Sequence, residues 1–168
     1  MRETAAEVRE LQALMDAVYP GSTEHLRNII KGQKQLSAAA LVQVATGMCV
    51  LSLATVTAKG EPRISAVDGH LLHGRWVFTT SGSAAKARHL RARPAASAAY
   101  IDGERIGVFT HGAVEFLTEK DPDFAEIEEY MVGHYGESPS GWGPDIVYLR
   151  LQPTWIAAYG NERKLLGG

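Results

Sequence analysis

The pattern of apolar and polar positions changes from helical spacing to strand alternation near Gly47. Before Gly47, apolar side chains recur at i, i+3, i+7 and i+10, which predicts a helix over Glu3–Tyr19 that Pro20-Gly21 stops. These side chains are Val8, Leu11, Met15 and Val18. A second short helix is predicted to open at Ser22 or Thr23 and to run through Ile30, and a third covers about Gln35–Thr46. The chain before Gly47 is therefore expected to be helical.

After Gly47 the pattern is mostly β, with turn residues between apolar runs. The predicted strands are Met48–Thr57, Arg63–Val67, Leu71-Leu72, Arg75–Thr80, Ala95–Ile101, Ile106–Leu117 and Ile146–Tyr159. Two helices interrupt them, one over Ser83–Arg91 and one that Asp121-Pro122 caps, with Pro122 at the first helical position, and that ends near His134. Tyr135–Asp145 is predicted as a loop, and Pro153 indicates a bulge or an edge. Six or seven strands with few helices between them favour an antiparallel barrel, mainly β with flanking helices.

Composition limits the classes of partner. A chain of 168 residues is long enough for one domain, and a net charge of −2 gives no global attraction to nucleic acid or a membrane, so we expect neither as a partner. The uncharged stretch Leu36–Ala58 is long enough to cross a bilayer. Its polar side chains, and its change from alanine-rich to β-branched, instead predict a buried helix followed by a core strand. The single Cys49 is assigned to the core, and without a basic-then-apolar leader we expect a cytoplasmic protein.

The stretch with the most candidate chemistry is Trp76–Leu90, an apolar strand that breaks into hydroxyls and glycine and restarts as a basic helix. Free N–H groups and the positive dipole end of that helix favour an anion such as a phosphate. Ser83 is a candidate helix cap, and Lys86 lies in the first helical turn. The hydroxyls that can donate to the anion are those of Thr79, Thr80, Ser81 and Ser83. An ordinary capped helix is the alternative, and Ser65 and Thr79 can equally be plain strand residues.

The order of several motifs resembles a known family. The motifs are the strand Met48–Thr57, Gly60-x-Pro62-Arg63-x-Ser65, Val77-Phe78-Thr79-Thr80, Ser83-x-x-Lys86 and Arg93-Pro94. Together they resemble the pyridoxamine 5'-phosphate oxidase-like split-barrel family of flavin and deazaflavin proteins. The resemblance implies a split β-barrel over residues 47–168, with residues 1–46 as an N-terminal helical extension. It also implies a homodimer with two cofactor sites at the subunit interface, each built from both chains.

The resemblance also implies roles for particular residues. Arg63 matches an arginine near the cofactor phosphate, Thr79 and Thr80 match the strand end that meets the flavin, and Lys86 matches the phosphate-binding lysine. Ser65 lies two positions after Arg63, on the same strand face. Three other family positions are not matched, because a lysine, an arginine and a glutamine of the family fall on Asp68, Ala85 and Gly107. The arginine and histidine with which true pyridoxamine 5'-phosphate oxidases hold their substrate have no clear match, so the fold is better supported than that reaction.

The function predicted from the resemblance is an FMN-dependent oxidoreductase that acts on a small molecule. A flavin supplies its own redox chemistry, so the absence of a convincing triad or carboxylate pair is consistent with it, and no catalytic residue is assigned. The residues predicted to bind the phosphate and ribityl end are Arg63, Ser65, Thr79, Thr80, Ser81, Ser83 and Lys86.

Two other functions stay open. The first uses the deazaflavin coenzyme F-420, whose acidic tail would suit the positive charge of Arg88, Arg91 and Arg93. The second is a non-catalytic flavin or haem carrier. The six histidines lack metal-ligand spacing, so no metal site is predicted, although His111 is the best candidate for a haem ligand. Trp142 and Tyr135 either cover a flat ring from the partner subunit or pack within their own loop.

Overall fold

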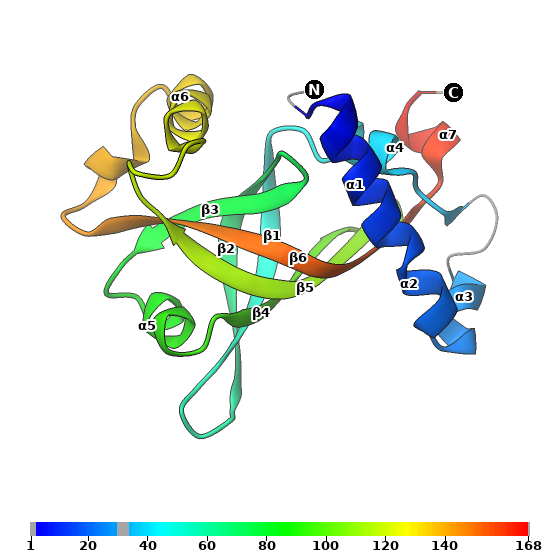
Figure 1. The fold of residues 1–168 in the computed structure, drawn as a ribbon, viewed down its shortest axis with the longest axis horizontal. Coiled ribbons are helices and arrows are strands. Elements are labelled where there is room, and N and C mark those ends of the chain that lie inside the picture. The colour runs from blue at the N-terminus through cyan, green and yellow to red at the C-terminus, as the bar shows by residue number, and fades with distance from the viewer. Residues whose placement is uncertain (1–2, 30–33, 168) are drawn as a thin grey trace.

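Six antiparallel strands form a closed barrel in the order β1-β2-β3-β6-β5-β4 (Figure 1). The structure is a computed structural model that describes residues 3–29 and 34–167. The strands are β1 Met48–Val56, β2 Pro62–Leu72, β3 Arg75–Ser81, β4 Ala95–Asp102, β5 Ile106–Leu117 and β6 Ile146–Gly160. The predicted mainly β barrel with flanking helices is therefore confirmed.

Helices surround the barrel on several sides. Figure 1 shows α1 and α4 along one side, α6 on the opposite side, and α5 below the strands. The helices are α1 Ala5–Asp16, α2 Val18–Gly21, α3 Glu24–Ile29, α4 Ala38–Val44, α5 Ala85–Ala92, α6 Phe124–Tyr135, the short 3-10 helix η2 Pro139–Trp142 and α7 Glu162–Leu165. None of the helices in residues 3–29 and 34–167 is long and apolar enough to cross a membrane.

The core lies inside the barrel and continues under α1 and α4. Alternate residues of β1 point inward, and Leu51 and Leu53 are fully buried beside Trp76. The Trp76 indole N–H donates to Thr110 Oγ1 at 3.1 Å, which satisfies its polar atom inside the core. Cys49 is buried on the same face of β1, as predicted. The uncharged stretch Leu36–Ala58 supplies α4 and β1 and not a membrane span.

The N-terminal helices differ from the prediction in their boundaries. α1 begins after Thr4, whose hydroxyl accepts from Glu7 N at 3.2 Å while the Glu7 carboxylate accepts from Thr4 N at 2.7 Å. The predicted stop at Pro20-Gly21 is wrong, because both residues lie inside α2. Proline is tolerated in the first turn of a helix, where its missing N–H needs no partner. The predicted position Ile30 lies outside the described residues.

The third predicted helix is shorter in the structure. α4 covers Ala38–Val44 because Ser37 caps it, accepting from Ala40 N at 3.1 Å. Gln35, where the helix was predicted to begin, instead forms a single β-bridge with Tyr159.

β2 is one continuous strand, which corrects the predicted break between Val67 and Leu71. The polar residues of this segment interrupted the apolar pattern, yet the backbone pairs with β1 throughout. Gly69 lies against the buried Leu51 side chain, and a Cβ on Gly69 would come within 2.3 Å of Leu51 Cδ1. The glycine therefore marks a close approach inside the barrel and not a turn.

The bulge predicted near Pro153 is present. The register of β5 and β6 shifts between His111, which pairs with Trp155, and Gly112, which pairs with Pro153. The extra residue, Thr154, increases the local bend of the long strand β6. A Cβ on Gly112 would come within 1.9 Å of the Gln152 carbonyl oxygen, so the bulge needs glycine on the partner strand.

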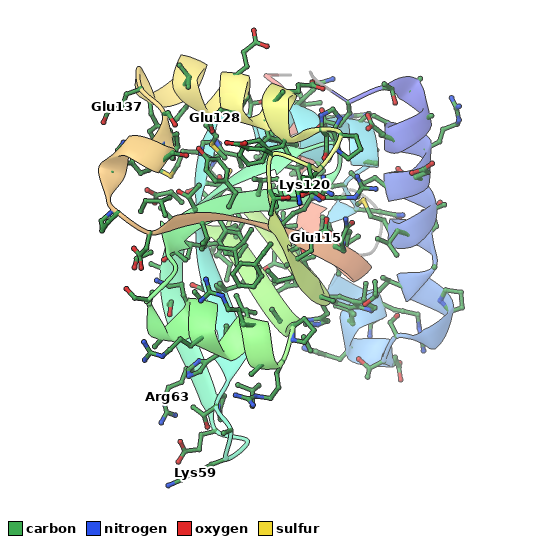
Figure 2. All side chains as sticks on the ribbon, turned by 60° about the vertical axis from the view of Figure 1, so that its left-hand side comes forward. Lys59, Arg63, Glu115, Lys120, Glu128 and Glu137 are labelled. Atoms are coloured by element: carbon green, nitrogen blue, oxygen red, sulfur yellow. The ribbon has the colours of Figure 1, made fainter. Side chains whose placement is uncertain are left out.

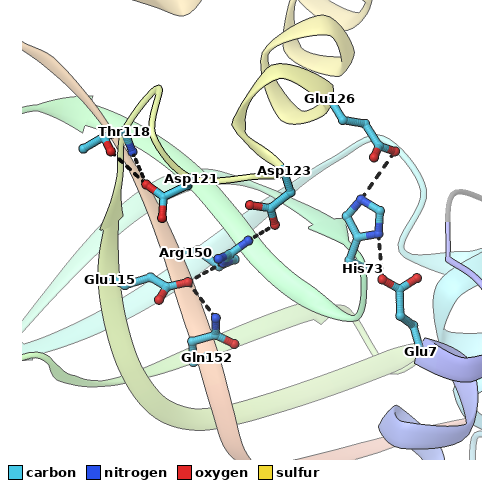
Figure 3. Close-up of polar contacts among 9 residues, drawn as sticks. All are labelled: Glu7, His73, Glu115, Thr118, Asp121, Asp123, Glu126, Arg150 and Gln152. Atoms are coloured by element: carbon cyan, nitrogen blue, oxygen red, sulfur yellow. Dashed lines mark hydrogen bonds and ion pairs between the residues drawn. The ribbon is translucent and has the colours of Figure 1, made fainter.

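α6 begins later than predicted. Asp121 does not cap the helix, because its carboxylate accepts from Thr118 N at 2.7 Å and from Thr118 Oγ1 at 2.9 Å (Figure 3). The residue before the helix is Asp123, whose side chain binds Arg150 on β6 and not a helical N–H. Arg150 also binds Glu115 on β5. The Asp123 carboxylate therefore links the start of α6 to Arg150 of the barrel, and it makes no capping hydrogen bond to the helix.

His70 holds α6 against the outer face of β2. Its side chain is fully buried, with Nδ1 at 3.0 Å from the Tyr130 hydroxyl and Nε2 at 2.8 Å from the Tyr135 hydroxyl. The His134 ring makes an edge contact with it at 4.8 Å between centroids. Burial, and then the nearby His134, lowers the pKa of His70 from 6.5 to about 4, so the ring is neutral at pH 7.

His73 joins three elements at the β2–β3 turn. Its Nδ1 lies 2.9 Å from Glu7 Oε1 of α1, and its Nε2 lies 3.4 Å from Glu126 Oε1 of α6 (Figure 3). The residue has a φ of 53°, in the left-handed region that most side chains avoid. The turn is therefore held in a strained conformation by partners on two helices.

Candidate functional site

The barrel wall opens where β2 and β3 part. The two strands pair only from Gly69 and Phe78 to Leu72 and Arg75, whereas β2 extends back to Pro62 and β3 extends on to Ser81. We call this opening the fork. α5 lies beside it, and its His89 Nδ1 is 3.0 Å from the Oγ1 of Thr55, a buried inward-facing residue of β1. The predicted site residues belong to the two arms of the fork and to α5.

Thr80 and Lys86 meet at the fork. Thr80 lies two residues after the buried Phe78 on β3, so it points to the inner side of the wall, and Lys86 Nζ lies 3.4 Å from Thr80 Oγ1. Thr79 points to the opposite side, the side that α6 covers, because its neighbour Val77 packs in the cluster with Ile127 of α6. The structure therefore brings Thr80 and Lys86 together and separates them from Thr79.

The Ser81–Ser83 turn is already bound to a carboxylate. Ser81 Oγ lies 2.9 Å from Asp145 Oδ1, and Ser83 N donates to Asp145 Oδ2 at 2.8 Å. The main chain of Gly82 also donates to the Asp145 carbonyl oxygen at 2.7 Å. The Ser81 hydroxyl, more than that of Ser83, holds the pKa of the Asp145 carboxyl below its usual range. The donors predicted to hold a phosphate are thus engaged with an anion of the protein itself.

Ser83 is not the cap of α5, contrary to the prediction. The helix starts one residue later, with Ala84 as the N-cap and no side-chain bond to the first turn. The reason is that the Ser83 hydroxyl lies 2.7 Å from Ser81 Oγ and its N–H is bound to Asp145. The first helical N–H groups, next to Lys86, are therefore without a side-chain cap.

Arg63 and Ser65 lie on the other arm of the fork. They pair across the sheet with Thr55 and Leu53, whose side chains face inward. The side chains of Arg63 and Ser65 therefore leave β2 on the same inner face, which α5 covers. Arg63 is exposed and bound to Glu61, with Nη2 2.9 Å from Oε2. Figure 2 shows Arg63 and Lys59 near the tip of the β1–β2 hairpin, beyond α5. Within one chain, Arg63 therefore stands apart from the pair formed by Thr80 and Lys86.

Three arginines in and directly after α5 bind main-chain carbonyls. Arg91 Nη1 donates to Gly82 O at 2.5 Å, and its guanidinium lies over the Phe116 ring at 4.9 Å from the centroid. Arg88 donates to Ser83 O, and Arg93 Nε donates to Val56 O at 3.1 Å. Each guanidinium has further N–H groups, so Arg88 and Arg91 keep positive charge beside the Ser81–Ser83 turn, whereas Arg93 lies at the C-terminal end of α5.

The outer face of β1, β2 and β4 carries exposed apolar side chains. Because cross-strand neighbours share a face, Val50 lies opposite Asp68 and Ala54 lies opposite Ile64 on this surface. Ile64 is 75% exposed, which is unusual for a large aliphatic residue beside other apolar positions. The exposed large apolar residues of this face are Met48, Val50, Val56, Ile64 and Ile101.

Sequence reasoning missed Asp145 and His89 as neighbours of the site. Asp145 precedes β6, and it reaches the turn because Ser81 pairs with Ile146. The strands were predicted, but their pairing was not, so no local signal pointed to Asp145. His89 was visible as a helical residue after Lys86, and its position one turn further along α5 was the signal available.

His111, which was predicted as the best candidate for a haem ligand, lies on the outer face of the barrel. His111 stacks on Trp155 with centroids 4.5 Å apart, and its Nδ1 lies 2.8 Å from Ser97 Oγ. Tyr135 and Trp142 contact each other edge-on at 4.8 Å. Among residues 3–29 and 34–167, no three His, Cys, Asp or Glu side chains are grouped as a metal ion requires.

A hollow of about 670 Å³ lies at the other end of β6 from Asp145. Its walls include Arg105, Tyr159 and Lys164. Tyr159 also covers Gly107, where a Cβ would come within 2.5 Å of the Tyr159 ring. None of the predicted site residues lines this hollow. The fork and the hollow are therefore separate places on the barrel.

The sequence itself identifies the family of the chain. The sequence pattern of the family described as pyridoxamine 5'-phosphate oxidase matches residues 38–160. The chain belongs to this family, as the motifs predicted. No curated protein matches it in sequence.

Solved structures show the same fold at low identity. The conserved hypothetical protein Rv2991 of Mycobacterium tuberculosis is 19% identical with a TM-score of 0.64, over 82% of this chain and 92% of that one. HutZ, the heme storage protein of Vibrio cholerae, is 22% identical with a TM-score of 0.63, over 73% and 94%. An F-420 reductase is 23% identical with a TM-score of 0.54, over 68% and 94%. At these identities the likeness establishes the fold alone.

Proposed function

We propose that this chain is a flavin-dependent oxidoreductase that uses FMN, with the cofactor phosphate bound at the fork. Membership of the pyridoxamine 5'-phosphate oxidase family supports a flavin-type cofactor. The observation that carries the choice of place is the contact of Lys86 with Thr80, beside the uncapped first turn of α5. A cation, a hydroxyl and free N–H groups in one place are the donors that a phosphate requires.

The residues at the fork fit a phosphate in part. Thr80 and Lys86 are half-buried, so solvent competes less for their hydrogen bonds than at a fully exposed site. Ser81 and Ser83 are engaged with Asp145, so their share of the binding is smaller than the motif suggested. When bound, a flavin supplies the hydride chemistry, while the chain binds and orients it. Arg63, Ser65 and Thr79 remain candidates for contacts with the rest of the cofactor.

We further propose that two copies of the chain form a homodimer through the exposed apolar face of β1, β2 and β4. Burying side chains such as Val50, Ile64 and Ile101 against a second copy would remove them from water. The partner chain would also bring groups to the fork that one chain does not contain. Light scattering of the purified protein is expected to give twice the mass of one chain, and a strict monomer would contradict the two-chain site.

The test of the proposed function is a titration with FMN, followed by fluorescence. Lys86→Ala is expected to weaken binding by about 1.5–3 kcal/mol, because a charge-assisted hydrogen bond to the phosphate is lost. Lys120→Ala, which removes an exposed lysine on the loop before α6, is the control and is expected to leave binding unchanged. Equal affinity of the Lys86 variant and the wild type would show that the phosphate does not bind at the fork.

The deazaflavin F-420 is a second candidate, because the positive charge of Arg88 and Arg91 beside the turn, and of Arg93 at the other end of α5, suits an acidic tail. Titration of the same protein with F-420 separates the two candidates. An absorbance spectrum of the purified protein adds a further distinction, since a Soret band would indicate a haem carrier. A colourless protein that binds neither FMN nor F-420 would overturn the redox proposal.

A further inference from the structure

Asp145 places a fixed negative charge at the turn that the cofactor phosphate would approach. Its carboxylate accepts from both the Ser81 hydroxyl and the Ser83 N–H, at 2.9 and 2.8 Å. Hydrogen bonds of this kind stabilise the ionised form, and they hold the pKa of the Asp145 carboxyl below its usual range. The carboxylate is therefore charged at any pH at which the cofactor would be studied.

The backbone prevents this charge from moving far. Gly82 N donates to the Asp145 carbonyl oxygen at 2.7 Å, and the next residue, Ile146, pairs with Ser81 in the sheet. A side chain as short as aspartate reaches only a small volume when its main chain is fixed. An incoming anion would find the Asp145 carboxylate close by, even after it had taken over the donors of Ser81 and Ser83.

We propose that Asp145 determines the charge preference of the site by repelling a doubly charged phosphate monoester. The inference rests on the proposed function, since it takes the fork as the place of the phosphate. Two unit charges about 4 Å apart repel even in a medium as polar as water, and a phosphate monoester carries nearly two charges at neutral pH. Asp145 therefore weakens the binding of FMN relative to an uncharged flavin, while Lys86, together with Arg88 and Arg91 beside the turn, offsets part of the repulsion.

The test compares FMN with riboflavin, which has the same ring and ribityl chain without the phosphate. Asp145→Asn keeps the shape and one acceptor oxygen of the side chain and removes the charge. In low salt at pH 7.5, we expect D145N to bind FMN about tenfold more tightly than the wild type, with riboflavin affinity changed by less than about twofold. The gain for FMN is expected to shrink in high salt, because salt screens exposed charges.

Asp121 offers a matched control. Like Asp145, it is an aspartate that accepts from one backbone N–H and one hydroxyl, both of Thr118, at 2.7 and 2.9 Å. Asp121→Asn removes the same charge from a similar local arrangement after β5, a strand that β6 separates from β3 and the Ser81–Ser83 turn. We expect D121N to bind both flavins as the wild type does. If D145N proves unstable, Asp145→Ser is measured in its place, since serine offers a polar oxygen without carrying charge.

The outcomes separate this inference from the proposed function. A gain for FMN alone supports the inference, because a merely structural role of Asp145 would change both ligands alike. Equal FMN affinity of D145N and the wild type overturns the inference and leaves the proposed function standing. An equal gain for FMN and riboflavin also overturns it, since charge would then not be the cause. Binding of neither flavin by any variant overturns the proposed function, and the inference with it.

Discussion

The two ends of β2 are built in opposite ways. At one end, the strand pairs with both β1 and β3, His70 is fully buried between two tyrosine hydroxyls, and His73 joins α1 to α6. At the other end, beyond the fork, the strand pairs with β1 alone, and Arg63 and Ile64 are exposed. One strand thus begins in a region that is open to a ligand or partner and ends in a region that is closed by its own chain.

The difference between the two ends indicates which part of β2 stabilises the fold and which part is accessible for binding. The closed end satisfies every ring nitrogen of His70 and His73 with a partner from another element. The open end has polar groups and apolar surface that one chain leaves exposed to solvent. Residues at the closed end are expected to matter for folding, and residues at the open end for binding.

The largest effect is expected from His70→Ala. The variant leaves a cavity at a fully buried position and removes the ring partners of the Tyr130 and Tyr135 hydroxyls. We expect the free energy of unfolding to fall by about 3 kcal/mol, measured by urea denaturation. A loss below about 1 kcal/mol would mean that the closed end is not the stable part of β2.

The dependence of the free energy of unfolding on pH is expected to reflect the titration of the same histidine, His70. Burial lowers the pKa of His70 from 6.5 to about 4, so between these values the unfolded chain binds more protons than the folded one. The contribution is complete above about pH 6.5 and is lost as the pH falls toward 4, by up to about 3 kcal/mol. Denaturation curves at several pH values test this, and His70→Gln, which does not titrate, should have a flatter profile in that window.

The smallest effect on stability is expected at the open end. Arg63→Ala removes an ion pair with Glu61 that is about half exposed on both sides, and such pairs contribute little. We expect the free energy of unfolding to change by less than about 0.5 kcal/mol, and the proposed homodimer, by bringing Arg63 to the phosphate, predicts that FMN affinity falls. A loss of stability as large as that of His70→Ala would erase the contrast between the two ends.

Much of the fold could be predicted because it follows local pattern. β5 was predicted with its observed bounds, since its apolar residues and flanking turns are continuous in the sequence. β2 was predicted as two pieces because Asp68, Gly69 and His70 interrupt its apolar pattern. Their strand geometry depends on Leu51 across the sheet and on the tyrosines of α6, which no local pattern contains.

The candidate site was predictable only where its parts are close in sequence. Thr80 and Lys86 are six positions apart, and a strand followed by a helix brings them together. Asp145 reaches the same turn only through the pairing of β3 with β6, and pairing between distant strands is not encoded in either strand alone. Asp145 lies outside the motif, and it is also the reason that the N-cap of α5 is Ala84 and not Ser83.

The position of β6 also sets an order of events during synthesis. β3 and β5 both pair with β6, the last strand of the barrel, so neither has its full set of neighbours until residues 146–160 have left the ribosome. Pairing between distant segments slows folding and leaves strand edges exposed meanwhile. The Ser81–Ser83 turn waits for Asp145 and Ile146 in the same way. A nascent chain therefore acquires this anion-holding turn among the last parts of the barrel, when most of the protein has already been made.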